Sequence, residues 1–156
     1  MFPQSKIAKF FFPFATSLLL TAIYFKAFRL ISPAYSHEVE ISGDVAATFH
    51  IEPNHNPKAG QPTQAWFALT RKGGTIIPLN DCNCQLAVYS LPRRPNTQPI
   101  LKPTLKSINA EKYKGIPGAE ITFPKADSYQ LEISGNPKES GKFKPFKLTF
   151  EVNVSK

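Results

Sequence analysis

The strongest structural constraint in this sequence is a period-two alternation of apolar and polar residues. It is clearest near the carboxyl terminus, where residues 145–154 read PFKLTFEVNV. Phe146, Phe150 and Val154 fall on one side of this segment, and its charged and polar residues fall on the other. Because successive side chains of a β-strand point to opposite faces, this pattern predicts a strand with one buried and one solvated face.

The same alternation recurs along the chain and predicts further strands. The candidate segments are HEVEIS (37–42), VAATFHI (45–51), AWFALT (65–70), TIIPL (75–79), CQLAVYSL (84–91), AEITF (119–123) and YQLEIS (129–134). Lys72-Gly73-Gly74 predicts a hairpin between two of them. The 15 prolines leave room for little helix after the first 36 residues, apart from one turn near Ser107–Lys112. Seven or eight short strands at this spacing predict an all-β, immunoglobulin-like sandwich.

The first 36 residues differ in composition from the rest of the chain and predict an export signal. A basic start is followed by an apolar run at residues 10–25. Ala34 and Ser36 are the small residues expected before a cleavage site. Cleavage after Ser36 would leave the sandwich as a mature domain, residues 37–156.

An uncleaved membrane anchor is the alternative for this leader. Lys26 and Arg29 lie between the apolar run and the predicted cut, where signal peptides usually avoid positive charge. An apolar helix at residues 7–25 comes close to the length that spans a bilayer. We therefore expect the domain in the periplasm or the thylakoid lumen, or anchored in the membrane by this segment.

The charge of the chain limits its expected partners. All 11 acidic residues and 15 of the 19 Lys and Arg residues lie after position 36, which leaves this part weakly basic. Its lysines are scattered and are not interleaved with aromatic residues, so we expect no nucleic-acid partner. The expected partners are the membrane, through the N-terminal segment, and another protein.

The three histidines form the first candidate site. After the predicted cut, His37 would offer an amine and an imidazole nitrogen, which together chelate Cu(II) in its preferred tetragonal geometry. His50, which alternates away from Phe49, or His55, which we expect to be solvated in a loop, would complete the site. Whether His37 and His50 meet depends on the strand register, which the sequence does not fix. The alternative is three unrelated surface histidines.

The final third of the chain, ADSYQLEISGNP…FKPFKLTFEVNV, resembles the closing strands of small exported immunoglobulin-like domains of the YtkA-like, FixH-like and CopC-like groups. The sequence from His37 onward is also similar to uncharacterised exported cyanobacterial proteins. The CopC-like resemblance implies a Cu(II) site built from a mature N-terminal His, a second His and an acidic residue. Only His37 can be carried over from it. The Met-rich Cu(I) site of many CopC-like domains has no counterpart, because Met1 is the only methionine.

Two aromatic residues have alternative roles in such a sandwich. Tyr129 could form a tyrosine corner, in which its hydroxyl bonds to nearby backbone, or could pack in the core. Trp66 is the only tryptophan and is expected in the sandwich core. Phe67 has the opposite parity and could take that place instead.

Cys82 and Cys84 form the second candidate site. Residues i and i+2 of a strand share a face about 6.5–7 Å apart, at or beyond the limit for a disulfide, so a bond would require residues 80–84 to be a turn. An oxidising compartment favours that bond. Two reduced thiolates could instead hold Cu(I) or Zn(II) with a nearby histidine. Cys84 could also belong to the core, since it shares its parity with Leu86 and Val88.

The sequence contains no G-x-S-x-G, H-E-x-x-H or phosphate-binding loop, so we expect no enzyme and no catalytic residues. The first hypothesis is a non-enzymatic binding module with copper as its candidate cofactor. The candidate metal ligands are His37, His50, His55, Cys82 and Cys84. The alternative is an interaction or assembly domain of the cell envelope or thylakoid lumen that recognises a protein through a sheet face or edge strand and binds no metal.

Overall fold

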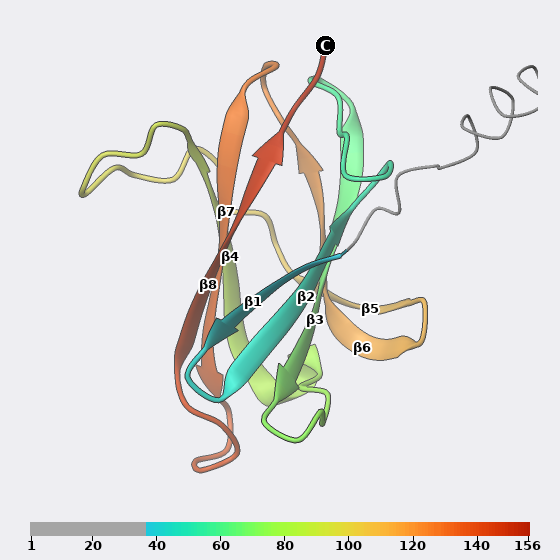
Figure 1. Cartoon of the computed structure of the whole chain (residues 1–156), viewed down its shortest axis with the longest axis vertical. Coiled ribbons are helices and arrows are strands. Elements are labelled where there is room, and N and C mark those ends of the chain that lie inside the picture. Colours follow the sequence, from blue (N-terminus) through green and yellow to red (C-terminus); the bar gives the residue numbers. More distant parts are fainter. Residues whose placement is uncertain (1–36) are drawn as a thin grey trace, which may run out of the picture. The chain divides into compact units, whose positions relative to one another are not determined.

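The computed structural model describes residues 37–156, which Figure 1 shows as strands linked by loops. The elements are β1 (Glu38–Ser42), β2 (Val45–Ile51), β3 (Pro62–Arg71), the 3-10 turn η1 (Leu79–Asp81), β4 (Cys82–Ser90), β5 (Lys106–Ala110), β6 (Tyr113–Thr122), β7 (Ser128–Pro137) and β8 (Phe146–Asn153). Within residues 37–156, no helix is long and apolar enough to cross a bilayer. The predicted leader, its apolar helix, its cut after Ser36 and the anchor at residues 7–25 lie outside the described residues.

The strands form two antiparallel sheets (Figure 1), with the orders β1-β2-β3-β6-β5 and β4-β7-β8. The order β2-β3-β6-β5 matches the first sheet of a constant-type immunoglobulin domain, and β4-β7-β8 matches the second. Strand β1 is an addition at the edge, beside β2. The all-β sandwich predicted from the alternation is therefore confirmed.

Two segments differ from their predicted structure. Residues 75–79 make one isolated bridge, Thr70–Ile76, and then turn into η1, because Pro78 has no N–H to continue a ladder. The turn expected near Ser107–Lys112 is instead strand β5, which pairs with β6. Strand β5 escaped prediction because its residues are exposed or only half-buried and carry little alternation.

The core lies between the two sheets and is filled by the alternating apolar residues. Phe49 of β2 is fully buried, with its ring centroid 4.8 Å from that of Phe150 and 5.2 Å from that of Phe67. Trp66 does not enter this core, so its predicted position was wrong, and Phe67 occupies the core instead. Trp66 packs with Ala68 and Ile116 on the opposite face of the first sheet.

Tyr129 forms the predicted tyrosine corner. Its ring is fully buried, and its hydroxyl donates a hydrogen bond of 2.9 Å to the backbone carbonyl of Lys125. This bond fixes the loop that carries the chain from the first sheet into β7 of the second. Tyr129 therefore fills both predicted roles: its ring packs in the core and its hydroxyl forms the corner.

The variant Tyr129→Phe tests the contribution of this hydrogen bond. We expect the free energy of unfolding to fall by about 1 kcal/mol, because the ring is kept while the Lys125 carbonyl loses its donor. Urea titration measures the change. Tyr113→Phe is the matched control, since that ring lies outside the sandwich core. Equal midpoints for the two variants would contradict a stabilising role for the corner.

A charged network covers the outer face of the second sheet. Arg93 Nη1 lies 2.8 Å from Glu132 Oε2, and Lys147 Nζ lies 3.3 Å from Glu132 Oε1. The Arg93 guanidinium stacks 3.4 Å above the ring centroid of Tyr89. Burial alone would raise the pKa of Glu132, but the hydrogen bonds from Arg93 and Lys147 outweigh it and lower that pKa below its ordinary value.

We expect Arg93→Ala to lower the free energy of unfolding by about 1–2 kcal/mol at pH 7, because a mostly buried carboxylate loses a charged donor. The lowered pKa means that Glu132 stabilises the fold above its unfolded pKa and loses this effect as pH falls through its folded pKa. The difference in unfolding free energy between wild type and variant should therefore narrow as the pH falls below the ordinary pKa of a glutamate. Unfolding titrations at several pH values measure it, with the exposed Arg94→Ala as control. If the difference in unfolding free energy did not change with pH, the stabilising role of the Arg93–Glu132 ion pair would be refuted.

Candidate metal centre

Strand register brings His37 and His50 together. Glu38 pairs with Phe49 in the β1–β2 ladder, so the preceding residue, His37, lies across from His50, and His50 pairs with Trp66 of β3. Because Phe49 faces the core, His50 faces away from it, as its parity predicted. The His50 ring stacks on Trp66 at 5.1 Å between centroids, and the His37 ring lies 5.3 Å from that of His50.

His55 reaches the same face from the turn that follows β2. Its N–H donates a 2.8 Å hydrogen bond to the Ile51 carbonyl, and Asn54 and His55 both adopt left-handed backbone conformations, with φ of 49° and 57°. This tight turn folds the side chain back over the sheet, where its ring lies 4.7 Å from that of His50. The solvated loop position expected for His55 was therefore wrong: its Nε2 is buried.

Each of the three histidines offers one ring nitrogen to a group in which these atoms all lie within 4.8 Å of one another. Imidazole nitrogens bind a metal at about 2.0–2.1 Å, so ligands of one ion lie up to roughly 4 Å apart. Side-chain rotations that bring the nitrogens inward by about 1 Å would close the group on an ion. Among residues 37–156, no group that includes Cys82 or Cys84 has this spacing.

Two carboxylates stand behind the histidines. His50 Nε2 lies 3.1 Å from Glu52 Oε1, and His37 Nε2 lies 3.2 Å from Glu111 Oε1. A carboxylate on one ring nitrogen fixes the orientation of the imidazole and makes its other nitrogen a better ligand. In His50 that other nitrogen, Nδ1, is buried and has no hydrogen-bond partner in the described part of the chain, and the same holds for His55 Nε2. A bound cation would satisfy both atoms.

The electrostatics at His55 favour a neutral imidazole. Burial lowers the pKa of His55 below its ordinary value, and the proximity of His50 and then His37 lowers it further. A metal binds the unprotonated ring nitrogen, so this shift keeps the lone pair of His55 available. The cluster can therefore bind a cation at neutral pH without first releasing a proton from His55.

A surface cavity of about 250 Å³ adjoins His50 and leaves access to one side of the cluster. Its lining combines side chains from β2, β3 and the β5–β6 hairpin, namely His50, Glu52, Gln64, Trp66, Ile108 and Glu111. A cavity of this size holds several waters or a small ligand. Of the three histidines, His50 is the one that lines this cavity.

The carboxylates and Trp66 were not identified from the sequence. Glu52 follows His50 by two residues, so an extended chain places both side chains on the same face, and this spacing could have revealed the contact. Glu111 could not be found in this way, because it comes from the turn between β5 and β6 and reaches the cluster only through the sheet order. Trp66 was assigned to the other face of its strand.

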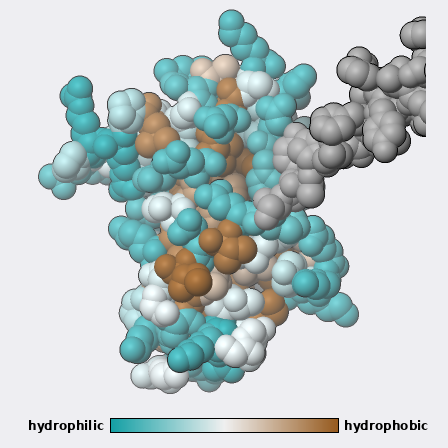
Figure 2. Space-filling model, viewed as in Figure 1, coloured by the Kyte–Doolittle hydropathy of each residue, from teal (hydrophilic) through white to brown (hydrophobic). Residues whose placement is uncertain are grey.

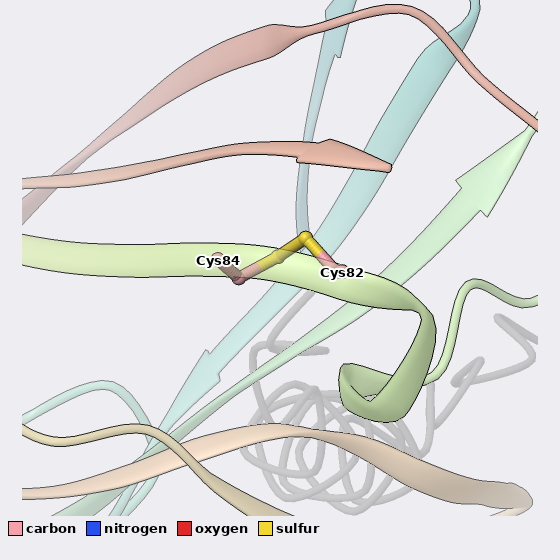
Figure 3. The surroundings of a disulfide bond; sticks show 2 residues. All are labelled: Cys82 and Cys84. Carbon is pink, nitrogen blue, oxygen red and sulfur yellow. A yellow bond between two sulfur atoms is a disulfide. The ribbon is translucent and has the colours of Figure 1, made fainter. Parts of the chain in front are cut away.

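Cys82 and Cys84 are joined by a disulfide at the start of β4, immediately after η1 (Figure 3). Their Cα atoms lie 5.1 Å apart, closer than regular strand geometry gives, so the expectation that the bond requires a turn at residues 80–84 was wrong. Bonded sulfurs are not thiolates, and in this state the pair cannot bind a metal. The metal role of the reduced pair stays a prediction.

No protein-family model matches this sequence, and a search of curated proteins found no match. Among solved structures, the chain is similar to a DUF4426 family protein from Pseudomonas aeruginosa. The TM-score is 0.50 and the identity 10%, over 76% of this chain and 96% of that one. At this identity the likeness shows the fold alone: a small β-sandwich domain. The resemblance to YtkA-like, FixH-like and CopC-like domains stays a prediction.

Proposed function

We propose that this chain is an exported, non-enzymatic binding module that holds Cu(II) at His37, His50 and His55. The observation that carries the proposal is the convergence of three imidazoles, contributed by two strand positions and a turn, with carboxylates behind two of them. Three separate surface histidines would not require buried ring nitrogens that lack partners, as in His50 and His55. The leader supports delivery to the cell envelope or thylakoid lumen.

Copper is favoured over other divalent metals by the ligand set. Cu(II) binds nitrogen ligands more tightly than the other first-row divalent ions do, and it accepts tetragonal geometry. If the leader is cut after Ser36, the α-amine of His37 adds a fourth nitrogen beside the three imidazoles. The CopC-like resemblance supports the same ligand at this position, with Glu52 or Glu111 as the acidic residue near the ion.

Equilibrium dialysis of Cu(II) against protein that begins at His37 tests the proposal. We expect one ion per chain, and quenching of the single tryptophan, because Trp66 stacks on His50. Electron paramagnetic resonance should show coupling to several nitrogens. Protein that retains Tyr35 and Ser36 is the matched control, since its His37 lacks a free amine and should bind at least about tenfold more weakly. The absence of stoichiometric uptake by the correctly processed protein would refute the metal site.

Recognition of a protein partner through β1 is the second candidate function. Strand β1 is an edge of the first sheet, and two of its apolar side chains are exposed, Val39 at 56% and Ile41 at 72%. Figure 2 shows hydrophobic surface on the face that β1 crosses. An edge strand that carries exposed apolar side chains can bind a segment of another protein.

Crosslinking in the native host distinguishes this second candidate. A partner that binds through β1 should be captured by the wild type and lost in Ile41→Glu. It should be retained in His50→Ala, because His50 is not needed for the edge to pair. Loss of the partner only when copper is removed would instead favour the metal function.

A further inference from the structure

The Cys82–Cys84 disulfide has no role in the proposed metal site, yet its surroundings differ from those of a structural bridge. The bond spans a sequence separation of only 2. Both cysteines are already fixed by the β4–β7 ladder, in which Cys82 pairs with Pro137 and Cys84 with Gly135. The disulfide therefore links no segments that the sheet leaves apart, and a loop this short gains little by closure.

The two cysteines differ in their exposure. Cys82 is 2% exposed, whereas Cys84 is half-buried at the margin of the core. Both line a surface cavity of about 840 Å³ between the β4 side of the second sheet and the loop near Pro103. This volume admits a peptide segment with several side chains, and Cys84 is the more exposed of the two cysteines that line it.

The cavity also has chemical features that suit thiol exchange. Lys102 and Lys138 line it together with one acidic residue, Glu132, so its charged lining is mainly positive and suits an approaching thiolate. On the opposite side, a Cβ on Gly135 would lie 2.6 Å from Cys82 Sγ and 2.9 Å from Cys84 Sγ. A side chain at this position would therefore clash with both sulfurs, and the glycine lets β7 pass directly against the cysteine pair.

We propose that Cys82–Cys84 is a thiol–disulfide exchange site that oxidises a dithiol on a partner peptide or protein. A partner thiolate attacks Cys84 Sγ, forming a mixed disulfide as the Cys82–Cys84 bond breaks, and Cys82 leaves as a thiolate that takes up a proton. The second partner thiol then loses its proton, attacks the partner's own sulfur in the mixed disulfide and releases Cys84. The partner loses two electrons and two protons in forming its disulfide, and the cysteine pair gains both.

Reduction of the folded full chain is the first test. The protein is incubated with graded dithiothreitol without denaturant, alkylated and weighed by mass spectrometry, while circular dichroism follows the fold. We expect both thiols to appear together, with one oxidised dithiothreitol formed per chain and the strand signal unchanged. Thiols that appear only after unfolding would overturn the proposal. The double variant Cys82→Ser/Cys84→Ser should remain folded; if it unfolds, the bond is structural and the proposal fails.

A matched pair of single variants tests the direction of attack. In Cys82→Ala the remaining Cys84 should form a mixed disulfide with oxidised glutathione at least about tenfold faster than Cys82 does in Cys84→Ala, because Cys84 is the more exposed residue. Equal rates, or a faster Cys82, would overturn the assignment. All exchange rates are measured with a copper chelator present, so this proposal can fail or succeed independently of the copper site.

Discussion

Replacing His50 with alanine is expected to lower the affinity for Cu(II) by at least about 100-fold, since even changes to residues behind metal ligands cost 10–100-fold. His50 lies between His37 and His55 in the cluster and also joins it to Glu52. The substitution removes one of the three candidate ligands, so that only His37 and His55 remain to hold the ion. Competition with a Cu(II) chelator of known affinity measures the loss.

The fold should tolerate this change, because His50 faces outward from β2 and is not part of the core. Thr48→Val is the matched control, since Thr48 lies on the same face of β2, two residues earlier. We expect the control to bind Cu(II) as the wild type does. Unchanged affinity in His50→Ala would show that the three histidines do not act as one site.

Phe49→Ala should have the largest effect on stability, a loss of about 3–5 kcal/mol in the free energy of unfolding. Phe49 is fully buried and its ring contacts those of Phe67 and Phe150, which connects the two sheets. A cavity at this position therefore removes contacts from both layers. Thermal unfolding measures the change, expected on the order of 10–25 °C in Tm.

The same substitution should also disturb the candidate metal centre. The Phe49 ring lies 5.7 Å from that of His55 and supports it from the core side. Ile41→Ala is the matched control: it removes an apolar side chain of the same sheet that is 72% exposed, so we expect a change within about 0.5 kcal/mol. Comparable losses in the two variants would contradict the assignment of Phe49 to the core.

Strands with one buried face could be predicted from the sequence, because burial on one side imposes alternation. Strands β2 and β8 alternate without interruption between core and surface, and their predictions were confirmed. Strand β5 has no such face, and it is held by its ladder with β6, which composition does not reveal. Trp66 and Phe67 are neighbours in β3 and both are buried, so hydrophobicity alone could not decide which faces the sandwich core.

The candidate site was predictable in its residue types and not in its assembly. The alternation along β2 predicted that His50 faces outward. Its proximity to His37, however, depends on the register between β1 and β2, which the sequence does not determine. His55 required the left-handed turn after β2, and Glu111 required the position of the β5–β6 hairpin. For the cysteines, ideal strand spacing argued against a bond that the local geometry of β4 permits.

His37 immediately precedes β1, a strand that has β2 as its one ladder partner. An edge strand of this kind opens locally more readily than the central strands of its sheet. An ion that joins His37 to His50 and His55 would link the start of β1 to β2 and to the following turn. Amide hydrogen exchange at Glu38 and Glu40, whose N–H groups face β2 in the alternating ladder, should then slow when Cu(II) is added. The beginning of the domain would thus be the part whose protection depends most on metal loading.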